Sequence, residues 1–452
     1  MKLQIGKKAN INYLAKVVNI TTFSQHPNPK VTKMKVAHIG GYSISVGIDS
    51  PVGYYVYFPT MSQLNPELLE YLNLYRKPDK NRDPEAKPGF FEENGRVKAI
   101  KLQGFPSEGF LLPYEHLNNW VVDSVNKELP EPVDGLEFSE VEDGGKTFWV
   151  CKKYVIRYTE RTSYYSKQDK KLKESKIIEN QFKFHYETPQ LRKDPSVIQP
   201  NDLIQISSKW HGTSFISSYI LCKKKLNWKE KIAKWLTKWE FPVYDHIYAS
   251  RKVIKNDDLN SGYYGSDDFR REVDNFLRPH MYPGMTIYGE IVGYTTENKD
   301  IQKNYDYRCR HLVEEETYTE SVHYKIYIYR ITLTNVNGNV FEFSARDVQN
   351  WCKLNGLRPV VELYYGYARN LYPDIPIDDN WSLNFLDRLA NDKENFWMEE
   401  LSPECNNRVP HEGIVIRVED GKSVAVKLKC FAFLNKEQES LDKGESNMED
   451  EG

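Results

Sequence analysis

The chain contains 452 residues, of which 28% are charged and 13% aromatic, and this balance excludes an intrinsically disordered or collagen-like polymer. Its length accommodates two or three domains with substantial hydrophobic cores. The formal net charge of −2 excludes a protein that is basic over its whole surface; because residues 435–452 contribute −5, residues 1–434 carry +3, and any nucleic-acid site must be a local basic patch.

The cysteine spacing and the N-terminus indicate an intracellular setting. Six cysteines are widely spaced and none forms a C-x-x-C pair, so we expect reduced thiols that fill apolar space. The N-terminus lacks the apolar core of a signal peptide, and no stretch approaches the roughly 18 apolar residues of a membrane helix. The sequence therefore predicts a soluble, cytoplasmic protein with no membrane association.

Residues 1–125 have the pattern of a small β-domain. Short runs rich in Val, Ile and Tyr are separated by Gly and Pro, and one helix is expected at 66–74. Five short strands and one helix favour a closed barrel of the OB type, a common platform for nucleic-acid strands, with another small β-barrel as the alternative. The expected strands are Ile11–Ile20, Val31–His38, Tyr42–Ile48, Tyr54–Phe58 and Val97–Leu102.

The rest of the chain divides into three further parts. Residues 126–190 are weakly patterned and predict a linker or extension, whose lysine-rich run at 164–176 favours a solvated linker over a phosphate-contacting arm. From 191 to 434, strands alternate with short helices, and the apolar residues of 227–239 share one helical face, which predicts core packing. The acidic tail, 435–452, is expected to be disordered.

Lys209 is the candidate nucleophile, in the motif Lys209-Trp210-His211-Gly212 after the apolar run Leu203–Ile206. A lysine attacks phosphorus only as the neutral amine, and its ordinary pKa of about 10.4 must be lowered by nearby cations or a metal ion. Gly212 allows a close backbone turn, and His211 is a candidate to orient pyrophosphate or a metal-bound water. Taken alone, a Lys-x-x-Gly pattern is weak because it arises often by chance.

A second charged group lies near the C-terminus. Glu412 precedes an apolar run, and the turn at 419–422 leads into a strand that carries Lys427 and Lys429 at alternate positions, so both lysines share one face. The hairpin predicts that Glu412 and Lys429 lie near the same end, as a metal–triphosphate site requires. The alternative is a strand edge protected by lysines.

Three further residues complete the candidate set. Glu290 ends a predicted strand at 286–290 and is a candidate for ribose or metal contact; Arg251 is a candidate for the β-phosphate or an RNA 5′-phosphate, since a guanidinium matches phosphate geometry. Tyr327 and Tyr329 share a strand face on which one ring could stack on a purine, and ordinary sheet packing is the alternative.

The order of Lys209, Arg251, Glu290, the tyrosine-rich strand, Glu412 and Lys427/Lys429 resembles the covalent nucleotidyltransferases. His211 is the third residue of the lysine motif, where DNA ligases and capping enzymes usually carry Asp. A histidine at this position resembles the motif of RNA ligases. The β-rich module precedes the lysine motif, and the segments 96–104 and 107–113 are similar to the first domain of the Deinococcus/Naegleria type of RNA ligase, the RNA ligase 5 family.

The resemblance implies an α+β chain: an OB-like nucleic-acid-binding domain at 1–125, then an adenylyltransferase domain at 191–434 of antiparallel sheets with flanking helices. It implies ATP and Mg²⁺ or Mn²⁺ as cofactors, and transfer of AMP through Lys209 to an RNA 5′-phosphate that a 3′-hydroxyl then attacks, at nicks in RNA duplexes or RNA/DNA hybrids with an RNA 3′-hydroxyl. The nucleotide contacts implied are Lys209, Trp210, His211, Gly212, Arg251, Glu290, Tyr329, Lys427 and Lys429, with Glu412 and Glu290 toward the metal.

One departure and two alternatives remain. Tyr329 is followed by Arg330, where relatives often carry Asp after the aromatic residue. The alternatives are another covalent nucleotidyltransferase, such as a DNA ligase or a capping-type guanylyltransferase, and a non-catalytic RNA-binding relative. The intact charged set disfavours the second, because a binding protein has no need for a lysine nucleophile.

Overall fold

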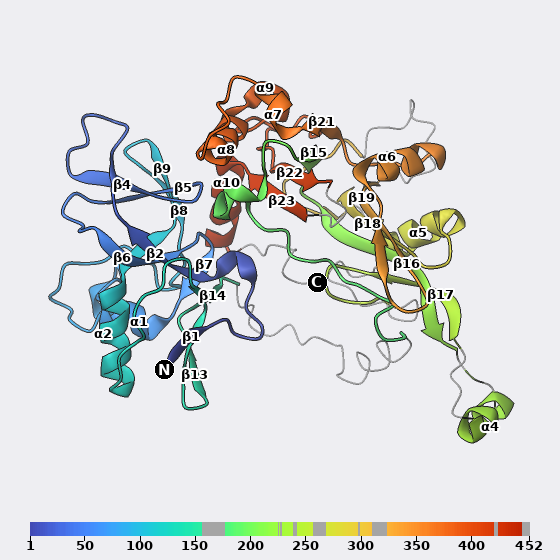
Figure 1. The fold of residues 1–452 in the computed structure, drawn as a ribbon, viewed down its shortest axis with the longest axis horizontal. Helices are drawn as coiled ribbons and strands as arrows, with labels where there is room; N and C mark the ends of the chain where they lie inside the picture. The colour runs from blue at the N-terminus through green and yellow to red at the C-terminus, as the bar shows by residue number, and fades with distance from the viewer. Residues whose placement is uncertain are drawn as a thin grey trace.

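The computed structural model describes residues 1–155, 177–224, 226, 228–237, 242–255, 268–296, 299–309, 323–419 and 424–444. Figure 1 shows an N-terminal half, in blue and cyan, beside a C-terminal half in green to red. Every pairing between the named strands of these ranges is antiparallel, and helices flank the sheets. The predicted class, α+β with antiparallel sheets, is confirmed.

A four-stranded sheet is the centre of the N-terminal half. Its order is β10-β6-β2-β11, with β2 at Ala15–Ile20, β6 at Gly53–Phe58, β10 at Phe110–Pro113 and β11 at Glu137–Phe138. Helices α1 (Pro66–Tyr71) and α2 (Tyr114–Val125) share a core with one face, and the sheet of β3 (Ser24–Gln25), β4 (Met34–Ile39) and β5 (Tyr42–Gly47) packs on the other. Alternate residues of β2 therefore enter two different cores.

The predicted OB-like barrel is not confirmed. The other N-terminal strands form three small sheets, and no sheet within residues 1–155, which are described throughout, closes on itself. A barrel wall has one inner face, whereas both faces of β2 and β6 are buried here, so the arrangement is layered. The small sheets are β1-β12-β13 (Lys2–Gln4, Glu140–Asp143, Lys146–Trp149), β14-β7 (Cys151–Lys153, Ser62–Leu64) and β8-β9 (Ala99–Leu102, Phe105–Glu108).

The region 126–190 differs from a simple linker. Its strands β11, β12 and β14 pair with strands from the first 64 residues, and β13 pairs with β12, so the N-terminal half continues to Lys153. These strands are only two to four residues long, which is too short for a clear hydrophobic period. The lysine-rich run at 164–176 lies outside the described residues. The segment that ends at Gln190 crosses the C-terminal half, where Gln190 bridges Lys427.

Two sheets build the C-terminal half. The first has the order β21-β15-β22-β23 and the second β17-β16-β18-β19-β20. Each covers its own hydrophobic core, and the candidate site lies between them. The first sheet comprises β15 (Leu203–Lys209), β21 (Glu362–Tyr367), β22 (Gly413–Val418) and β23 (Val424–Lys429); the second comprises β16 (Thr213–Lys223), β17 (Pro242–Ala249), β18 (Met285–Gly293), β19 (Tyr324–Thr334) and β20 (Val340–Glu342).

Helices cover the outer sides of these sheets. Helix α8 contributes to the core of the first sheet, and α5 and α6 to that of the second. None of the helices in the described ranges combines the length and the apolar content that crossing a membrane demands. Besides α4 (Trp228–Thr237) and α10 (Phe431–Asp442), the α-helices among the described residues of this half are α5 (Asp268–Leu277), α6 (Ala345–Leu354), α7 (Ala368–Leu371), α8 (Trp381–Asn391) and α9 (Lys393–Phe396).

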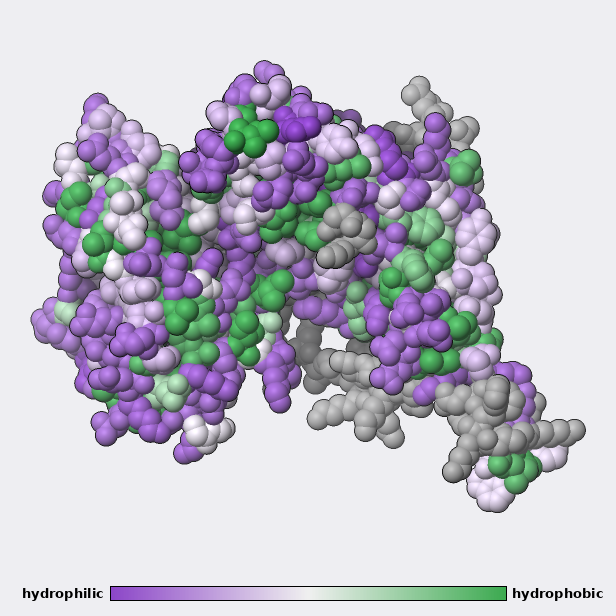
Figure 2. Space-filling view, in the orientation of Figure 1, coloured by the Kyte–Doolittle hydropathy of each residue, from purple (hydrophilic) through white to green (hydrophobic). Residues whose placement is uncertain are grey.

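Helix α4 (Trp228–Thr237) forms where the apolar period predicts a helix, but the prediction that its apolar face packs in the core is wrong. The side chains of Trp228, Ile232, Trp235 and Leu236 are between 50% and 80% exposed. Figure 1 shows α4 projecting beyond the strand ends, and Figure 2 shows apolar residues at that tip. Amphipathic spacing identifies an apolar face and does not identify what covers it.

Helix α10 (Phe431–Asp442) corrects the prediction of a disordered tail from 435. The tail is helical through Asp442 because its polar side chains have partners on the N-terminal half: Gln438 bonds to the backbone of Ala99, and Asp442 pairs with Arg96 and Lys98. Composition alone predicts disorder because it does not register such partners. Residues 445–452 lie outside the described ranges.

All six cysteines are free and buried, as the prediction of reduced, space-filling thiols requires. Burial raises the pKa of Cys151, Cys352 and Cys430 to about 12. Thiols held protonated in this way are poor nucleophiles and poor metal ligands. These three thiols are therefore poor candidates for the chemistry of the chain.

Candidate active site

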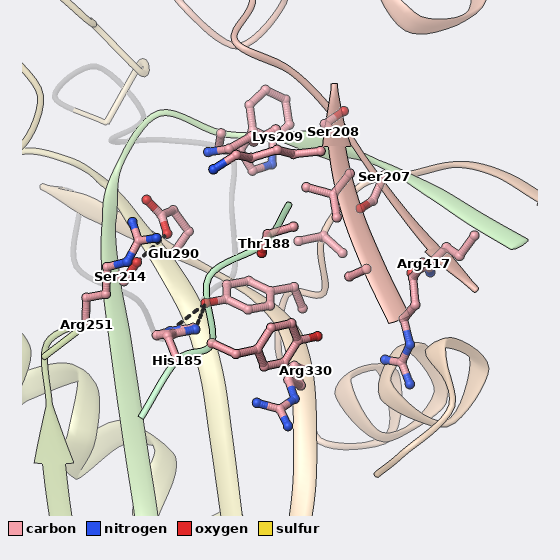
Figure 3. A pocket seen from close by; sticks show the side chains of 18 of the residues that line it. His185, Thr188, Ser207, Ser208, Lys209, Ser214, Arg251, Glu290, Arg330 and Arg417 are labelled. Carbon is pink, nitrogen blue, oxygen red and sulfur yellow. Dashed lines mark hydrogen bonds between the residues drawn. The ribbon is translucent and has the colours of Figure 1, made fainter. Parts of the chain in front are cut away.

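Lys209 is the last residue of β15 and lines a pocket between the two C-terminal sheets. The strand runs through the core, with Ile204 and Ile206 fully buried, and it carries Lys209 out of the core at its end. Figure 3 shows Lys209 at one end of the pocket and Arg330 and Arg417 at the other. We call these the phosphate end and the base end, after the nucleotide groups that the sequence predicts beside Lys209 and Tyr329.

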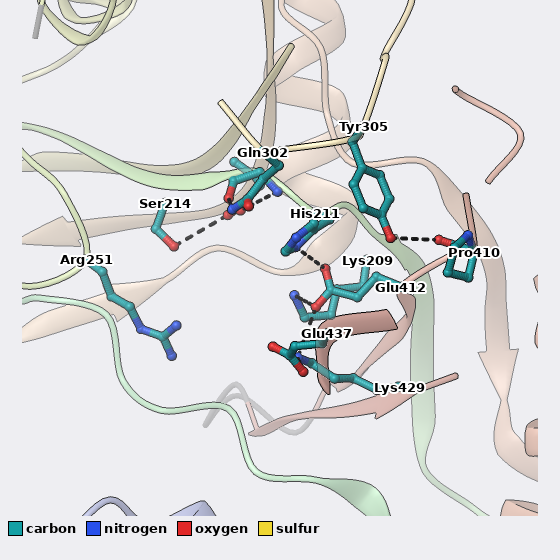
Figure 4. A network of polar contacts seen from close by, with 12 residues as sticks. Lys209, His211, Ser214, Arg251, Gln302, Tyr305, Pro410, Glu412, Lys429 and Glu437 are labelled. Carbon is teal, nitrogen blue, oxygen red and sulfur yellow. Dashed lines mark hydrogen bonds and ion pairs between the residues drawn. The ribbon is translucent and has the colours of Figure 1, made fainter. Parts of the chain in front are cut away.

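Glu412 connects the charged groups of the phosphate end (Figure 4). Its Oε1 lies 2.8 Å from Lys209 Nζ and 3.5 Å from Lys429 Nζ, and its Oε2 lies 3.7 Å from His211 Nδ1. The Glu412 side chain is only 1% exposed. Burying an unpaired carboxylate destabilises a protein by several kcal/mol. The charge of Glu412 therefore depends on the two ammonium groups that neutralise it, and their positions depend on Glu412.

The predicted hairpin of β22 and β23 is confirmed. Gly413 pairs with Lys429 and Val415 with Lys427, which places Glu412 beside Lys429 at one end of the hairpin. Val426 and Leu428 point into the core, so Lys427 and Lys429 share the opposite face. Lys427 lines the pocket of Lys209, and both lysines line a second pocket that faces the N-terminal half.

Two glycines let the backbones approach at this point. A Cβ on Gly212 would lie 2.3 Å from the carbonyl oxygen of Ile291, so the chain after Lys209 could not pass β18 with any larger residue. Gly413 has a φ of +136°, and a Cβ there would lie 2.1 Å from the Leu428 carbonyl oxygen. Glycine is therefore required for steric reasons at position 212, where the close approach of the two strands brings Lys209 and Glu290 to the same pocket.

Glu290 lies on β18 opposite Ser214 of β16. Its Oε1 accepts a hydrogen bond of 3.2 Å from the Gly212 amide, and its Oε2 accepts one of 3.5 Å from Ser214 Oγ. Across the described ranges, no group of three or more His, Cys, Asp or Glu side chains is placed to hold a metal ion. Mg²⁺ commonly binds one or two carboxylates together with substrate phosphates, and Glu412 and Glu290 offer hard oxygen ligands of that kind.

Arg251 follows β17 and lines both pockets. Its Nη2 lies 2.8 Å from Glu187 Oε2, a residue of the segment that crosses the C-terminal half. Figure 4 shows its guanidinium directed toward the group around Lys209. The structure thus brings Lys209, Arg251, Glu290 and Lys427 to one pocket and Lys429 and Glu412 to its edge.

Trp210 and His211 have different environments. Trp210 is buried against Tyr327, with ring centroids 5.4 Å apart, although it also borders the pocket. His211 lies edge-on to Phe433 at 5.0 Å and to Tyr305 at 4.9 Å. The neighbouring His411 is buried, and burial lowers its pKa to about 4, so it adds no positive charge beside Glu412 at neutral pH.

The two candidate tyrosines lie in different environments. Tyr327 packs in the core beside Trp210, and Tyr329 lines the pocket. A register shift between Tyr288 and Gly289 of β18 leaves Tyr329 unpaired in the β18–β19 ladder, as a β-bulge does. The Tyr329 hydroxyl lies 2.7 Å from His185 Nε2, and burial raises the pKa of the phenol well above its usual value, so the group is neutral.

Several pocket residues were not predicted. Arg330 forms a two-point ion pair with Glu342 of β20, at 2.6 and 2.8 Å, and the bulge lets both Tyr329 and Arg330 line the pocket. Ser208 Oγ lies buried in the pocket wall with no hydrogen-bond partner. The two serines directly before Lys209 are a signal that the sequence does carry, whereas His185 lies in a segment with no pattern.

Comparison with solved structures finds the Naegleria gruberi RNA ligase. A variant of it with AMP and Mn has a TM-score of 0.55 at 12% identity, covering 94% of this chain and 98% of that one. An apo variant gives 0.54 at 13% identity, covering 95% and 99%, and the ligase with PPi gives 0.53 at 11%, covering 95% and 100%. No protein-family model and no curated protein matches. Over nearly its whole length, the chain has the fold of an RNA ligase.

Proposed function

We propose that this chain is an ATP-dependent RNA ligase that joins RNA 3′-hydroxyl and 5′-phosphate ends through a lysyl-AMP intermediate on Lys209. The observation that carries the proposal is the pairing of Lys209 with the buried Glu412 at the end of a pocket that Lys427 and Arg251 also line. The fold of the Naegleria ligase, which has been solved with ATP, AMP and PPi, supports the same activity.

In the first step, the Lys209 amine attacks the α-phosphorus of ATP; an N–P bond forms, the bond to the bridging oxygen breaks, and pyrophosphate leaves. Lys209 must first lose a proton. Glu412 opposes this in the nucleotide-free site, because a carboxylate 2.8 Å from an ammonium group favours the charged form. The pair must therefore weaken when the nucleotide binds.

Glu412 and Glu290 are the residues that would hold Mg²⁺ or Mn²⁺. The bound ion supplies positive charge to the phosphates. A Glu412 carboxylate engaged in this way attracts Lys209 less, which favours the neutral amine. Lys427 and Arg251 add positive charge along the same wall, where they can receive the charge of the phosphates.

In the second and third steps, AMP passes from Lys209 to an RNA 5′-phosphate, and a 3′-hydroxyl displaces it to form the phosphodiester. The N–P bond breaks in the second step and the pyrophosphate linkage of the activated end in the third, releasing AMP. Arg251 lines both the pocket of Lys209 and the pocket toward the N-terminal half, which supports a contact of its guanidinium with each reactant. Nicked RNA duplexes and RNA/DNA hybrids with an RNA 3′-hydroxyl are the proposed substrates.

Intact mass after incubation with ATP and Mg²⁺ or Mn²⁺ tests the proposal, using protein first stripped of bound nucleotide. We expect the native chain to gain one AMP and Lys209→Ala to gain none. Absence of the adduct with either metal would favour the RNA-binding alternative. Replacing ATP by GTP, and an RNA by a DNA 3′-end at a nick, separates an RNA ligase from a capping-type enzyme and a DNA ligase.

A further inference from the structure

Helix α10 carries two adjacent rows of side chains that contact different halves of the molecule. Phe433 and Glu437, four residues apart, face the phosphate end, where Phe433 packs against His211 and Glu437 pairs with Lys429. Gln438 and Asp442, also four apart, face β8 and the residues before it. Figure 1 shows α10 between the two halves. Residues at this spacing share one side of a helix, so a single rigid element contacts both.

Lys429 lies between two carboxylates. Its Nζ is 3.5 Å from Glu412 Oε1 and 3.6 Å from Glu437 Oε2, and it lies 4.9 Å from the centre of the Phe433 ring. The side chains of Lys429 and Glu437 are 10% and 12% exposed, so water screens this contact little. Glu412 also pairs with Lys209 at 2.8 Å, and Glu437 therefore competes for Lys429 with a carboxylate that Lys209 also uses.

Both ends of α10 are fixed. At its start, the Glu399 carboxylate accepts hydrogen bonds from the amides of Phe431 and Ala432. Toward its end, Gln438 exchanges hydrogen bonds of 2.7 and 3.1 Å with the amide and carbonyl of Ala99, and Asp442 pairs with Lys98 at 3.0 Å and with the buried Arg96. The position of Glu437 therefore depends on the N-terminal half.

We propose that Glu437 is a positioning residue: held on α10 by the N-terminal half, it holds the Lys429 ammonium group midway between Glu412 and itself, where Lys429 can receive the phosphates of the bound nucleotide. The inference rests on the proposed function. Without Glu437, Lys429 moves toward Glu412 and neutralises the carboxylate that pairs with Lys209. Binding of the phosphate groups weakens, while the contacts to the nucleoside, at the far end of the pocket, are unaffected.

The first experiment measures the affinity of the full chain for ATP and for adenosine, with Glu437→Gln against native protein. We expect affinity for ATP to fall by roughly tenfold or more, the size seen when the outer partner of a binding group is removed. Adenosine, which has no phosphate, should bind as before. If Glu437 had a merely structural role, its substitution would lower the affinity for both ligands. An unchanged affinity for ATP would overturn the inference. Glu439→Gln, an exposed residue two positions along α10, is the matched control.

A double-mutant cycle tests whether Glu437 acts through Lys429. In the Lys429→Met background, Glu437→Gln should have no further effect on ATP affinity; a full additional loss would show that Glu437 acts through another group and would overturn the proposal. Asp442→Asn tests the link to the N-terminal half. This substitution should lower the affinity for ATP by a smaller factor and leave the affinity for adenosine unchanged. An unchanged affinity for ATP would show that the N-terminal half does not help to position Glu437.

The native chain separates this inference from the proposed function. If native protein forms the AMP adduct and Glu437→Gln binds ATP normally, the ligase assignment stands and the positioning role falls. If native protein neither binds ATP nor forms the adduct, both fall together.

Discussion

The two ends of the pocket are built in different ways. At the phosphate end, Lys209, Glu412 and Lys429 come from β15 and from the start and end of the β22–β23 hairpin, so their positions follow from one register. At the base end, Tyr329 and Arg330 come from a bulge in the second sheet, and His185 from a segment that crosses it. Strand register therefore places charged groups in positions that can be predicted from the sequence. The groups placed by a bulge or by a crossing segment cannot be predicted from the local periodicity of the sequence.

The largest effect is expected from removing the proposed nucleophile. Lys209→Ala should reduce AMP adduct formation by about 10⁴-fold or more, as loss of a covalent catalytic group does. Intact mass and sealing of a nicked RNA duplex measure it. Lys223→Ala, at the exposed end of β16, is the control and should react as the native chain does. Adduct formation by Lys209→Ala would place the nucleophile elsewhere.

Glu412→Gln should have the next largest effect. It keeps the shape of the side chain but removes the charge that pairs with Lys209 and Lys429 and that is proposed to hold the metal. We expect the rate of adduct formation at saturating ATP to fall by about 10² to 10³-fold. A native-like rate would contradict the metal role. Thermal unfolding checks folding, since loss of one partner from a buried charge set destabilises a protein by about 3–5 kcal/mol.

Arg330→Met tests the base end. It breaks the two-point pair with Glu342 and should raise the KM for ATP by about tenfold, with little change in the rate at saturation, because the reacting groups lie at the other end. Single-turnover adduct formation over a range of ATP concentrations gives both quantities. Arg346→Met, whose ion pair with Glu362 is half exposed, is the control. A fall in rate at unchanged KM would mean that the two ends are not separate.

Tyr329→Phe should have the smallest effect. It removes the hydroxyl bonded to His185 but keeps the ring, so a rise of about two- to fivefold in the KM for ATP is expected, equivalent to one neutral hydrogen bond. Tyr365→Phe on β21, outside the pocket, serves as the control. If the KM is unchanged and Tyr329→Ala is equally neutral, Tyr329 does not contact the base.

The sequence predicts well which residues meet around Lys209, and it predicts the remainder unevenly. The apolar strand before Lys209, the glycines and the alternation of Lys427 and Lys429 are local signals, and the structure brings these residues together. The layered N-terminal half is missed because the alternation in β2 does not reveal that both faces are covered. Helix α10 is missed because its stability depends on Arg96 and Ala99, more than 300 residues earlier.

The segment that carries His185, Tyr186 and Thr188 sets a limit on how this molecule can be divided. Sequence pattern favours starting an isolated C-terminal fragment at residue 191, yet that cut would delete one wall of the pocket of Lys209 and the partner of Arg251. A fragment starting before Ile177 would retain both, and it would still lack the N-terminal partners of α10. For expression or circular permutation, the two halves are better regarded as one unit, because Arg251 and Lys427 line both the pocket of Lys209 and the pocket that faces the N-terminal half.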